Sequence, residues 1–281
     1  MRPREGLGTD REYLRGSQYK DPTNLDARIA LHANYTRADE PWYRWLVGRI
    51  DWPVGAEVLE VGCGTGALWA NAAPRLPDLR LTLTDLSEGM LATAARTVAS
   101  IANIELAEAR ACDVQALPFP DAAFDIAVAN HMLYHAPDPR RAAAELARVL
   151  RPNGVLLAAT NGPQHLDAIT ELSRQALGWS PLDFSHRRFG RTSGQAILAG
   201  RFGSLHWHQH PSVMVCTDPD DVVAFITSTA AGQEASAEQR RALEEAVAVR
   251  FAEGGGSLHV SMDAGCFVGV RLEADTSRAP G

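Results

Sequence analysis

The sequence predicts an α/β fold, a doubly wound, mainly parallel seven-stranded sheet with an antiparallel edge strand, N-terminal helices and a lid insertion. Three observations support this fold. Short apolar strand patterns alternate with helical patterns through residues 51–160, which is typical of a parallel sheet covered by helices on both faces. Glycines follow the first of these strands directly. Two late strand patterns, with helices between them, complete the sheet.

The N-terminal part, residues 1–50, consists of an arm and two helices. Residues 1–23 are polar and rich in Arg, Gly and Asp, so we expect a flexible arm that orders over a ligand. Apolar side chains at helical spacing begin at Leu25, and the sequence near Pro41 breaks the pattern into two helices. We expect these helices to cover the functional site.

The central part, residues 51–160, forms the ligand-binding core. Its five expected strands are 58–61, 79–84, 104–109, 124–129 and 154–160. The helices expected between them are 67–75, 89–100 and 139–150. The alternation of strand and helix then ends at Asn161.

Residues 161–201 mix helix and loop, and we interpret them as a lid that binds the substrate. Residues 202–281 complete the sheet. The strands expected there are 204–216 and 258–272, with helices at 218–230 and 237–253 and a frayed tail at 273–281.

Composition excludes several classes of partner. The chain has 27 Lys and Arg against 34 Asp and Glu, a formal net charge of −7, so it lacks the positive field that attracts nucleic acid or anionic membranes. No run approaches the length of a membrane span, and the first ten residues lack the apolar region of a signal peptide. Four widely spaced cysteines indicate neither a zinc site nor a disulfide framework, and they fit a reduced, cytoplasmic setting. No oligomeric state follows from the sequence.

The run VLEVGCGTG, residues 58–66, is the most informative stretch. Its glycines, Gly62, Gly64 and Gly66, lie between a strand and a helix, where a doubly wound sheet binds an adenine nucleotide or nucleoside. Glycine lets the backbone approach a ligand closely. The spacing G-x-G-x-G differs from the G-x-G-x-x-G of dinucleotide folds. Glu60 precedes these glycines and can hold a ligand's ammonium group, which nicotinamide dinucleotides lack.

Acidic residues close the next two strands. Asp85 follows Gly66 by 19 residues, a position from which a carboxylate can accept both hydroxyls of a ribose. Asp113 can accept from an adenine amino group while Val114 offers its backbone. Spaced carboxylates without a lysine or a phosphate cradle favour a nucleoside ligand. The alternative for each Asp is a cap on the following helix or turn.

Five ordered motifs, VLEVGCGTG, TDLSEGML, CDVQALPFPDAAFD, AVANHMLYHAPDP and ELARVLRPNGVLLAAT, extend this pattern over roughly residues 55–160. In these motifs the chain resembles the class I S-adenosylmethionine-dependent methyltransferases, which have a Rossmann-like fold. The resemblance implies S-adenosylmethionine as the cofactor. The cofactor-binding residues that it implies are Gly62, Gly64, Gly66, Asp85, Leu86, Met90, Asp113, Val114 and Asn130. We add Glu60, Cys63 and Arg28 as further candidates for cofactor binding.

Methyl transfer from a sulfonium is an in-line displacement, and an acceptor that loses a proton needs a base. His131 follows the fourth strand at the ligand-binding edge of the sheet and is the first candidate. On the N-terminal helix His32 shares a face with Arg28 and Tyr35, and Tyr19 lies in the segment that folds across the site in many members of the family. Turn capping and ordinary helix packing are the alternatives for these histidines.

Four side chains are candidates for contact with the acceptor. They are Tyr35, Trp42, Tyr134 and His135, with core packing or turn capping as the alternative. His206, His208 and His210 would share one face of a strand. A solvated or lid-facing strand explains this spacing better than a metal site does, so we expect no metal.

We therefore expect an enzyme that methylates a small, aromatic secondary metabolite, because no RNA-binding or peptide-binding module is visible. Residues 24–32 are similar to N-terminal segments of natural-product methyltransferases, including those that methylate indole C3 and trigger closure to pyrroloindolines. O- or N-methylation of another metabolite is the alternative reaction. A nicotinamide-dependent oxidoreductase and a cofactor-binding protein without catalysis are the alternatives of other classes.

Overall fold

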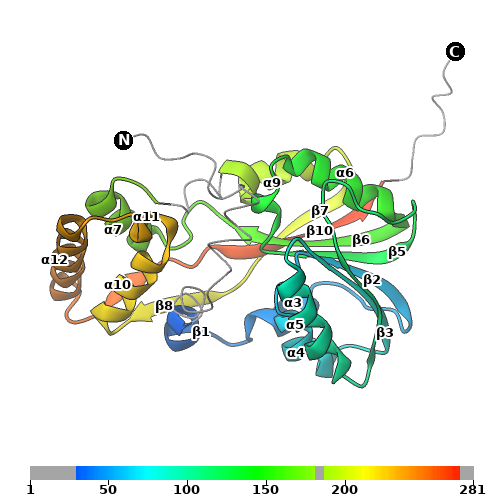
Figure 1. Cartoon of the computed structure of the whole chain (residues 1–281), viewed down its shortest axis with the longest axis horizontal. Helices are drawn as coiled ribbons and strands as arrows, with labels where there is room; N and C mark the ends of the chain where they lie inside the picture. The colour runs from blue at the N-terminus through cyan, green and yellow to red at the C-terminus, as the bar shows by residue number, and fades with distance from the viewer. Residues whose placement is uncertain (1–29, 181–186, 273–281) are drawn as a thin grey trace, which may run out of the picture. The chain divides into compact units, whose positions relative to one another are not determined.

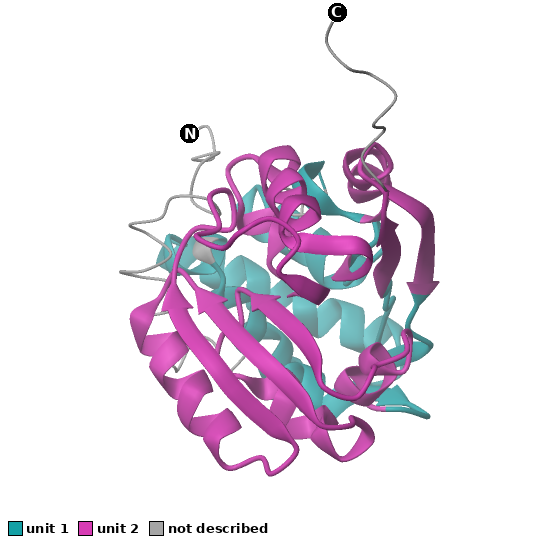
Figure 2. Cartoon of the chain, turned by 90° about the vertical axis from the view of Figure 1, so that its right-hand side faces the viewer, with its two compact units in different colours: residues 1–40, 161–190, 209–264 teal, residues 41–160, 191–208, 265–281 magenta. Residues whose placement is uncertain are grey.

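The computed structural model describes residues 30–180 and 187–272, and the chain folds into two compact units (Figure 2). Unit 1 comprises residues 1–40, 161–190 and 209–264, and unit 2 comprises residues 41–160, 191–208 and 265–281. Each unit has its own core of buried apolar side chains. The sheet that carries most of the expected site belongs to unit 2.

Unit 2 is built on a seven-stranded sheet with the strand order β4-β3-β2-β5-β6-β10-β7 (Figure 1). The strands are β2 (Ala56–Val61), β3 (Leu79–Asp85), β4 (Ile104–Ala111), β5 (Phe124–Asn130), β6 (Leu150–Asn161), β7 (Phe202–Gln209) and β10 (Ala264–Arg271). β2 pairs in parallel with β3 on one side and with β5 on the other, which places Val58 opposite Leu81 and Ile126. These three side chains are buried because helices cover both faces of the sheet.

One strand, β10, runs against the others. Leu272 N–H donates to Arg201 O, whereas His210 N–H donates to Ala264 O, so residue numbers fall along β10 as they rise along β7. The Arg271 guanidinium reaches Leu150 O at the start of β6, which gives β10 the opposite direction to β6 as well. The predicted seven-stranded, mainly parallel sheet is confirmed, and its antiparallel strand lies beside the edge strand β7.

The helices of unit 2 follow local signals in the sequence. They are α3 (Trp42–Val47), α4 (Ala67–Ala72), α5 (Glu88–Ala99), α6 (Pro139–Val149) and α9 (Arg191–Leu198). The Ser87 hydroxyl accepts from Met90 N–H and caps α5, while the Asp138 carboxylate accepts from two backbone N–H groups and caps α6 just before Pro139. The expected helix 67–75 ends as a 3-10 turn at Ala73–Arg75.

Unit 1 combines a small sheet with helices. Its strands, in the order β1-β8-β9, are β1 (Thr36–Ala38), β8 (Ser212–Cys216) and β9 (Leu258–Val260), and both pairings are antiparallel. Its helices are α7 (Asp167–Leu177), α10 (Pro219–Ser228), α11 (Ala230–Gln233) and α12 (Ala237–Glu253), and residues 30–35 are also helical. Ser236 and Gln239 form a reciprocal capping box at the start of α12.

Two expectations for the C-terminal part were wrong. The strand expected over residues 204–216 is two strands, β7 in the seven-stranded sheet and β8 in the three-stranded sheet. The strand expected over residues 258–272 is likewise divided into β9 and β10. Pro211 lies at the first break and cannot donate a backbone hydrogen bond to a ladder. A strand that the sequence did not predict, β1, also lies between the two N-terminal helical segments, residues 30–35 and α3.

Candidate functional site

The glycine loop of unit 2 connects β2 to α4. Gly62, Gly64 and Gly66 all have left-handed backbones, with φ of 63°, 55° and 77°. Cys63 N–H donates to Thr84 O at 3.0 Å, and Gly66 N–H donates to Cys63 O at 3.0 Å. The loop is therefore closed on itself and tied to the end of β3.

Two of these glycines differ in what surrounds them. A Cβ added to Gly62 would lie 2.8 Å from both Cβ and Cγ of Met132, which is closer than two carbon atoms pack. A Cβ added to Gly64 would meet no atom of the described residues within 4 Å. Gly62 is thus required by packing within the protein, whereas the face of Gly64 is open to a bound molecule.

Glu60 lies at the end of β2 and is only 2% exposed. Its Oε2 accepts a hydrogen bond of 2.5 Å from the indole N–H of Trp69, a fully buried residue of α4. Burial raises the pKa of the Glu60 carboxyl to about 8, against the opposing effect of the Trp69 hydrogen bond. A positive charge nearby would lower this pKa, because a cation stabilises the ionised form of the carboxyl.

Asp85 ends β3 and joins the glycine loop to the next turn. Its Oδ2 accepts from Gly64 N–H at 3.0 Å, and its Oδ1 accepts from Ser87 N–H at 2.8 Å. Leu86 follows in this turn, and Met90 lies in the first turn of α5. The carboxylate is therefore held in one orientation at the end of the sheet, where each oxygen keeps a further lone pair for a ligand.

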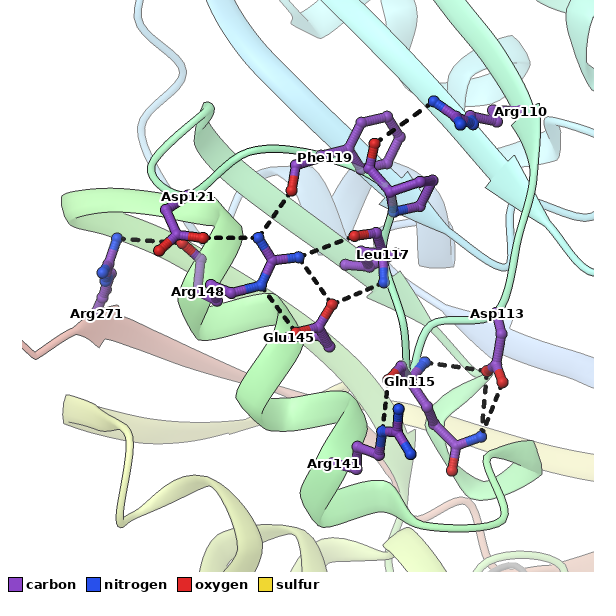
Figure 3. A network of polar contacts seen from close by, with 11 residues as sticks. Arg110, Asp113, Gln115, Leu117, Phe119, Asp121, Arg141, Glu145, Arg148 and Arg271 are labelled. Atoms are coloured by element: carbon purple, nitrogen blue, oxygen red, sulfur yellow. Dashed lines mark hydrogen bonds and ion pairs between the residues drawn. The ribbon is translucent and has the colours of Figure 1, made fainter.

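Asp113 lies in the loop after β4, beside the buried Val114. Its Oδ1 accepts from the backbone N–H of Gln115 at 3.0 Å, and both of its carboxylate oxygens lie within 3.2 Å of the Gln115 side-chain amide nitrogen (Figure 3). Sequence reasoning did not single out Gln115. The motif CDVQALPFPD contains it, but the contact depends on a side-chain orientation that the spacing alone does not give.

The rest of this loop is fastened to α6 by an ion-pair network (Figure 3). The Arg148 guanidinium donates to Phe119 O at 2.8 Å and to Leu117 O at 2.9 Å, and it pairs with the carboxylates of Glu145 and Asp121 at 2.8 Å. Glu145 also accepts from Leu117 N–H at 2.7 Å. This network fixes the path of the chain between β4 and β5.

The end of β5 brings together three predicted site residues. Asn130 is the last residue of the strand, and its Oδ1 accepts from the indole N–H of Trp42 at 3.2 Å. The ring of His131 lies 4.9 Å from that of Trp42, at a tilt of 40°. His131 has φ of 53°, an uncommon backbone for a residue with a side chain. Tyr134 and His135 follow in a 3-10 turn, and their rings are 4.6 Å apart.

Unit 1 holds a second group of predicted residues. The His32 ring stacks on His165 at 6.2 Å with an angle of 7° between their planes, and meets Phe225 edge-on at 6.4 Å. Burial lowers the pKa of His32, which favours the neutral imidazole. Sequence reasoning missed His165, because it lies in a segment without helix or strand periodicity. The phenol of Tyr35 donates to Asp221 Oδ2 at 2.6 Å, and this bond raises its pKa to about 12.

Three predicted site residues remain, namely Tyr19, Arg28 and Cys63. Tyr19 and Arg28 lie outside the described residues. Cys63 is buried, and burial raises the pKa of its thiol, so we assign it no nucleophilic role. The four cysteines are free.

Two further findings concern metals and membranes. His206 and His208 lie on β7, whereas His210 follows that strand and its Nε2 is 2.9 Å from Glu40 O. Across residues 30–180 and 187–272 no group of three or more His, Cys, Asp or Glu side chains is arranged to hold a metal ion. Within the same ranges no helix has the length and apolar character needed to cross a membrane.

Known proteins match the part of the chain that contains the glycine loop, Asp85, Asp113 and the end of β5. A family model described as a methyltransferase domain matches residues 59–158. The demethylmenaquinone methyltransferase of Bacillus licheniformis is 32% identical over 196 residues, which cover 68% of this chain and 75% of that protein. The malonyl-[acyl-carrier protein] O-methyltransferase of Halalkalibacterium halodurans is 28% identical over 56% of this chain and 59% of that protein.

Several other curated relatives are matched over about half of their length or less, from 36% to 54%. Among solved structures, the phosphoethanolamine N-methyltransferase 2 of Haemonchus contortus, in complex with phosphomonomethylethanolamine and S-adenosylhomocysteine, has a TM-score of 0.57 and 18% identity. The comparison covers 95% of this chain and 60% of that one, and at this identity it supports the fold alone.

Proposed function

The chain belongs to the class I S-adenosylmethionine-dependent methyltransferases, and from this membership we propose that it transfers a methyl group from S-adenosylmethionine to a small-molecule acceptor. The observation that carries the proposal is the glycine loop of unit 2, whose Gly64 N–H is held by the Asp85 carboxylate while the Cβ position of Gly64 is open. A backbone free of side chains next to a fixed carboxylate suits a ribose and the methionine part of the cofactor.

The charges of unit 2 also fit this cofactor. S-adenosylmethionine carries an ammonium group and no phosphate, and the loop offers carboxylates instead of a lysine. Glu60, whose pKa is raised to about 8 by burial, would be returned to its ionised form by an ammonium group nearby. Asp85 would accept hydrogen bonds from the ribose, and Asp113 with Val114 would meet the edge of the adenine. Gly62, Cys63, Gly66, Leu86, Met90 and Asn130 would line the rest of this site.

Bound at this site, S-adenosylmethionine would supply an electrophilic methyl group on a positively charged sulfur. The acceptor atom forms its bond to the methyl carbon as the bond from carbon to sulfur breaks. The protein's contribution is then alignment of the acceptor and, where the acceptor carries a proton, its removal by a base. We propose His131 for that role, because it follows β5 beside Asn130 and the Trp42 indole offers it an aromatic neighbour. His32 of unit 1 and Tyr19 are the other candidates.

For the acceptor we propose a small aromatic metabolite. Indoles are the first compound class to test, with C3 of the ring as the methylated atom. Trp42, Tyr134, His135 and Tyr35 are the aromatic side chains proposed to contact it. O- or N-methylation is the alternative, and the name of the relative from Halalkalibacterium halodurans, an O-methyltransferase, favours testing it in parallel.

The test is release of S-adenosylhomocysteine from S-adenosylmethionine with a panel of tryptophan diketopiperazines, phenols and amines, with NMR of the products. A methyl group on a ring carbon would support the indole proposal, and a methyl group on oxygen or nitrogen would overturn it. Calorimetry with S-adenosylhomocysteine tests the cofactor separately. Absence of binding, together with a thermal shift by NADH, would overturn the methyltransferase proposal.

The variants His131→Ala and His32→Ala test which of the two histidines is the base. The variant that lacks the base should lose turnover while its affinity for S-adenosylhomocysteine stays near the wild-type value. Equal losses of turnover and affinity in His131→Ala would contradict its role as base.

A further inference from the structure

Both ends of the Gln115 side-chain amide, in the loop after β4, are hydrogen-bonded. The residue is 7% exposed, and its amide nitrogen lies 3.2 Å from Oδ1 and 3.1 Å from Oδ2 of Asp113 (Figure 3). Its amide oxygen accepts from the backbone N–H of Asp138 at 2.8 Å. The two partners define the orientation of the amide, because a reversed amide would place oxygen against carboxylate and N–H against N–H.

The backbone of Gln115 is also anchored. Its carbonyl oxygen accepts from Nε of Arg141 at 2.8 Å, and Arg141 belongs to α6. Asp138 caps the same helix. Gln115 therefore connects the Asp113 carboxylate to the capped N-terminal turn of α6 through both its side chain and its main chain.

We propose that Gln115 is a positioning residue that orients Asp113 toward the exocyclic amine of the adenine and so determines the preference for an amino group at that ring position. The inference rests on the proposed function, because it places the adenine end of S-adenosylmethionine at Asp113. The amide occupies one side of both carboxylate oxygens and leaves their remaining lone pairs directed away from Gln115.

A carboxylate in a fixed orientation discriminates in two ways. It accepts a hydrogen bond from an amino group, and it repels a carbonyl oxygen at the same position. The site therefore favours a base that carries the amino group and also disfavours a base that carries the carbonyl oxygen. Without the Gln115 amide, the Asp113 side chain can turn away from a carbonyl oxygen. The preference should then fall even if the loop keeps its path, which the Arg148 network secures independently.

The experiment compares the affinities of two probes by calorimetry: S-adenosylhomocysteine, and S-inosylhomocysteine, in which a carbonyl oxygen replaces the exocyclic amine. We expect the wild-type protein to prefer the adenosyl compound by about tenfold or more, the value of one hydrogen bond to a charged group. Gln115→Met has a similar shape and no amide, and its preference should fall to about threefold or less. Gln195→Glu, at an exposed position on α9 of the same unit, is the control and should keep the wild-type preference.

Gln115→Glu adds a readout that general damage would not produce. The introduced carboxyl keeps an oxygen for Asp138 N–H but opposes the Asp113 carboxylate, so the preference should be lost at about pH 8. Burial beside a like charge raises the pKa of the new carboxyl, and on lowering the pH toward about 6 it should take up a proton and donate a hydrogen bond to the ionised Asp113 carboxylate. The preference should then return in part in this variant and not in Gln115→Met.

Thermal unfolding verifies that each variant is folded, and Gln115→Glu carries the test if Gln115→Met does not fold. If the wild-type protein and Gln115→Met bind the probes with the same preference, the role of Gln115 is overturned while the proposed function stands. If the wild-type protein binds neither probe, the proposed function fails and this inference fails with it.

Discussion

Replacing Gly62 and Gly64 separately should distinguish a glycine required for packing from a glycine required for binding. Gly62→Ala places a methyl group 2.8 Å from Cβ and Cγ of Met132 at a residue whose φ is 63°. The left-handed backbone costs a residue with a side chain about 1–2 kcal/mol. Overpacking against Met132 adds about 1–3 kcal/mol, so the free energy of unfolding should fall by about 2–5 kcal/mol in all.

Gly64→Ala carries only the backbone part of this cost. Its φ is 55°, and its added methyl group meets no described atom within 4 Å, so the loss of stability should be about 1–2 kcal/mol. The methyl group would instead occupy space proposed for the cofactor. Its main effect should therefore be a loss of affinity for S-adenosylhomocysteine, measured by calorimetry on the folded variant.

A double-mutant cycle tests whether contact with Met132 causes the larger loss of stability expected in Gly62→Ala. Met132→Gly removes all three Met132 atoms that the new methyl group of Gly62→Ala would meet, so the combined variant should lose less stability than the two single changes added together. The coupling should be about 1–3 kcal/mol, the overpacking share of the cost. Chemical denaturation of the four proteins gives this value. Additive changes, or a Gly62→Ala variant no less stable than Gly64→Ala, would refute the reasoning.

Three other changes test the surrounding contacts. Burial raises the pKa of Glu60 to about 8 in the folded chain. Between the ordinary carboxyl pKa and that value, the folded chain therefore binds one proton more than the unfolded chain. The free energy of unfolding should then fall as the pH rises through this range. Glu60→Gln should remove that fall, and unfolding experiments without cofactor on both sides of the range measure it. Asp85→Ala should weaken binding of S-adenosylhomocysteine by about 1.5–3 kcal/mol, and unchanged calorimetric affinity would contradict its assignment. Tyr35→Phe removes the 2.6 Å bond to Asp221 and should lower the free energy of unfolding by about 0.5 kcal/mol, because the pair is only half-buried.

The sequence predicted the features of this protein that depend on neighbouring residues. The strand, the glycine loop and the following helix lie within residues 56–72, so the spacing of Gly62, Gly64 and Gly66 was enough to indicate their position. Asp138 followed by Pro139 likewise marked the start of α6, since a capping side chain followed by proline is a local signal.

Features that depend on distant partners were not predictable in this way. Residues 204–216 alternate in the same manner whether they pair with β10 or with β9, so the pattern did not show that the chain changes sheets near Pro211. His165 is beside His32 only because two segments 133 residues apart meet in unit 1. Gln115 required the side-chain hydrogen bonds themselves, because glutamine two residues after aspartate is not a signal in any helix or strand pattern.

The place of β10 between β6 and β7 has a consequence for synthesis of the chain on the ribosome. Among the strands of residues 30–180 and 187–272, β7 has β10 as its only neighbour in the seven-stranded sheet, although β7 is made more than 50 residues earlier. A nascent chain that has passed β7 therefore leaves the backbone groups at the edge of β6 without a strand partner until residues 264–271 emerge. The β4-β3-β2-β5-β6 part of the sheet, with the glycine loop, can be assembled during that interval. The last step of sheet formation should then be the pairing of β10 with the open edge of β6, which also brings β7 into the sheet, and pairing across long sequence separations of this kind is slow.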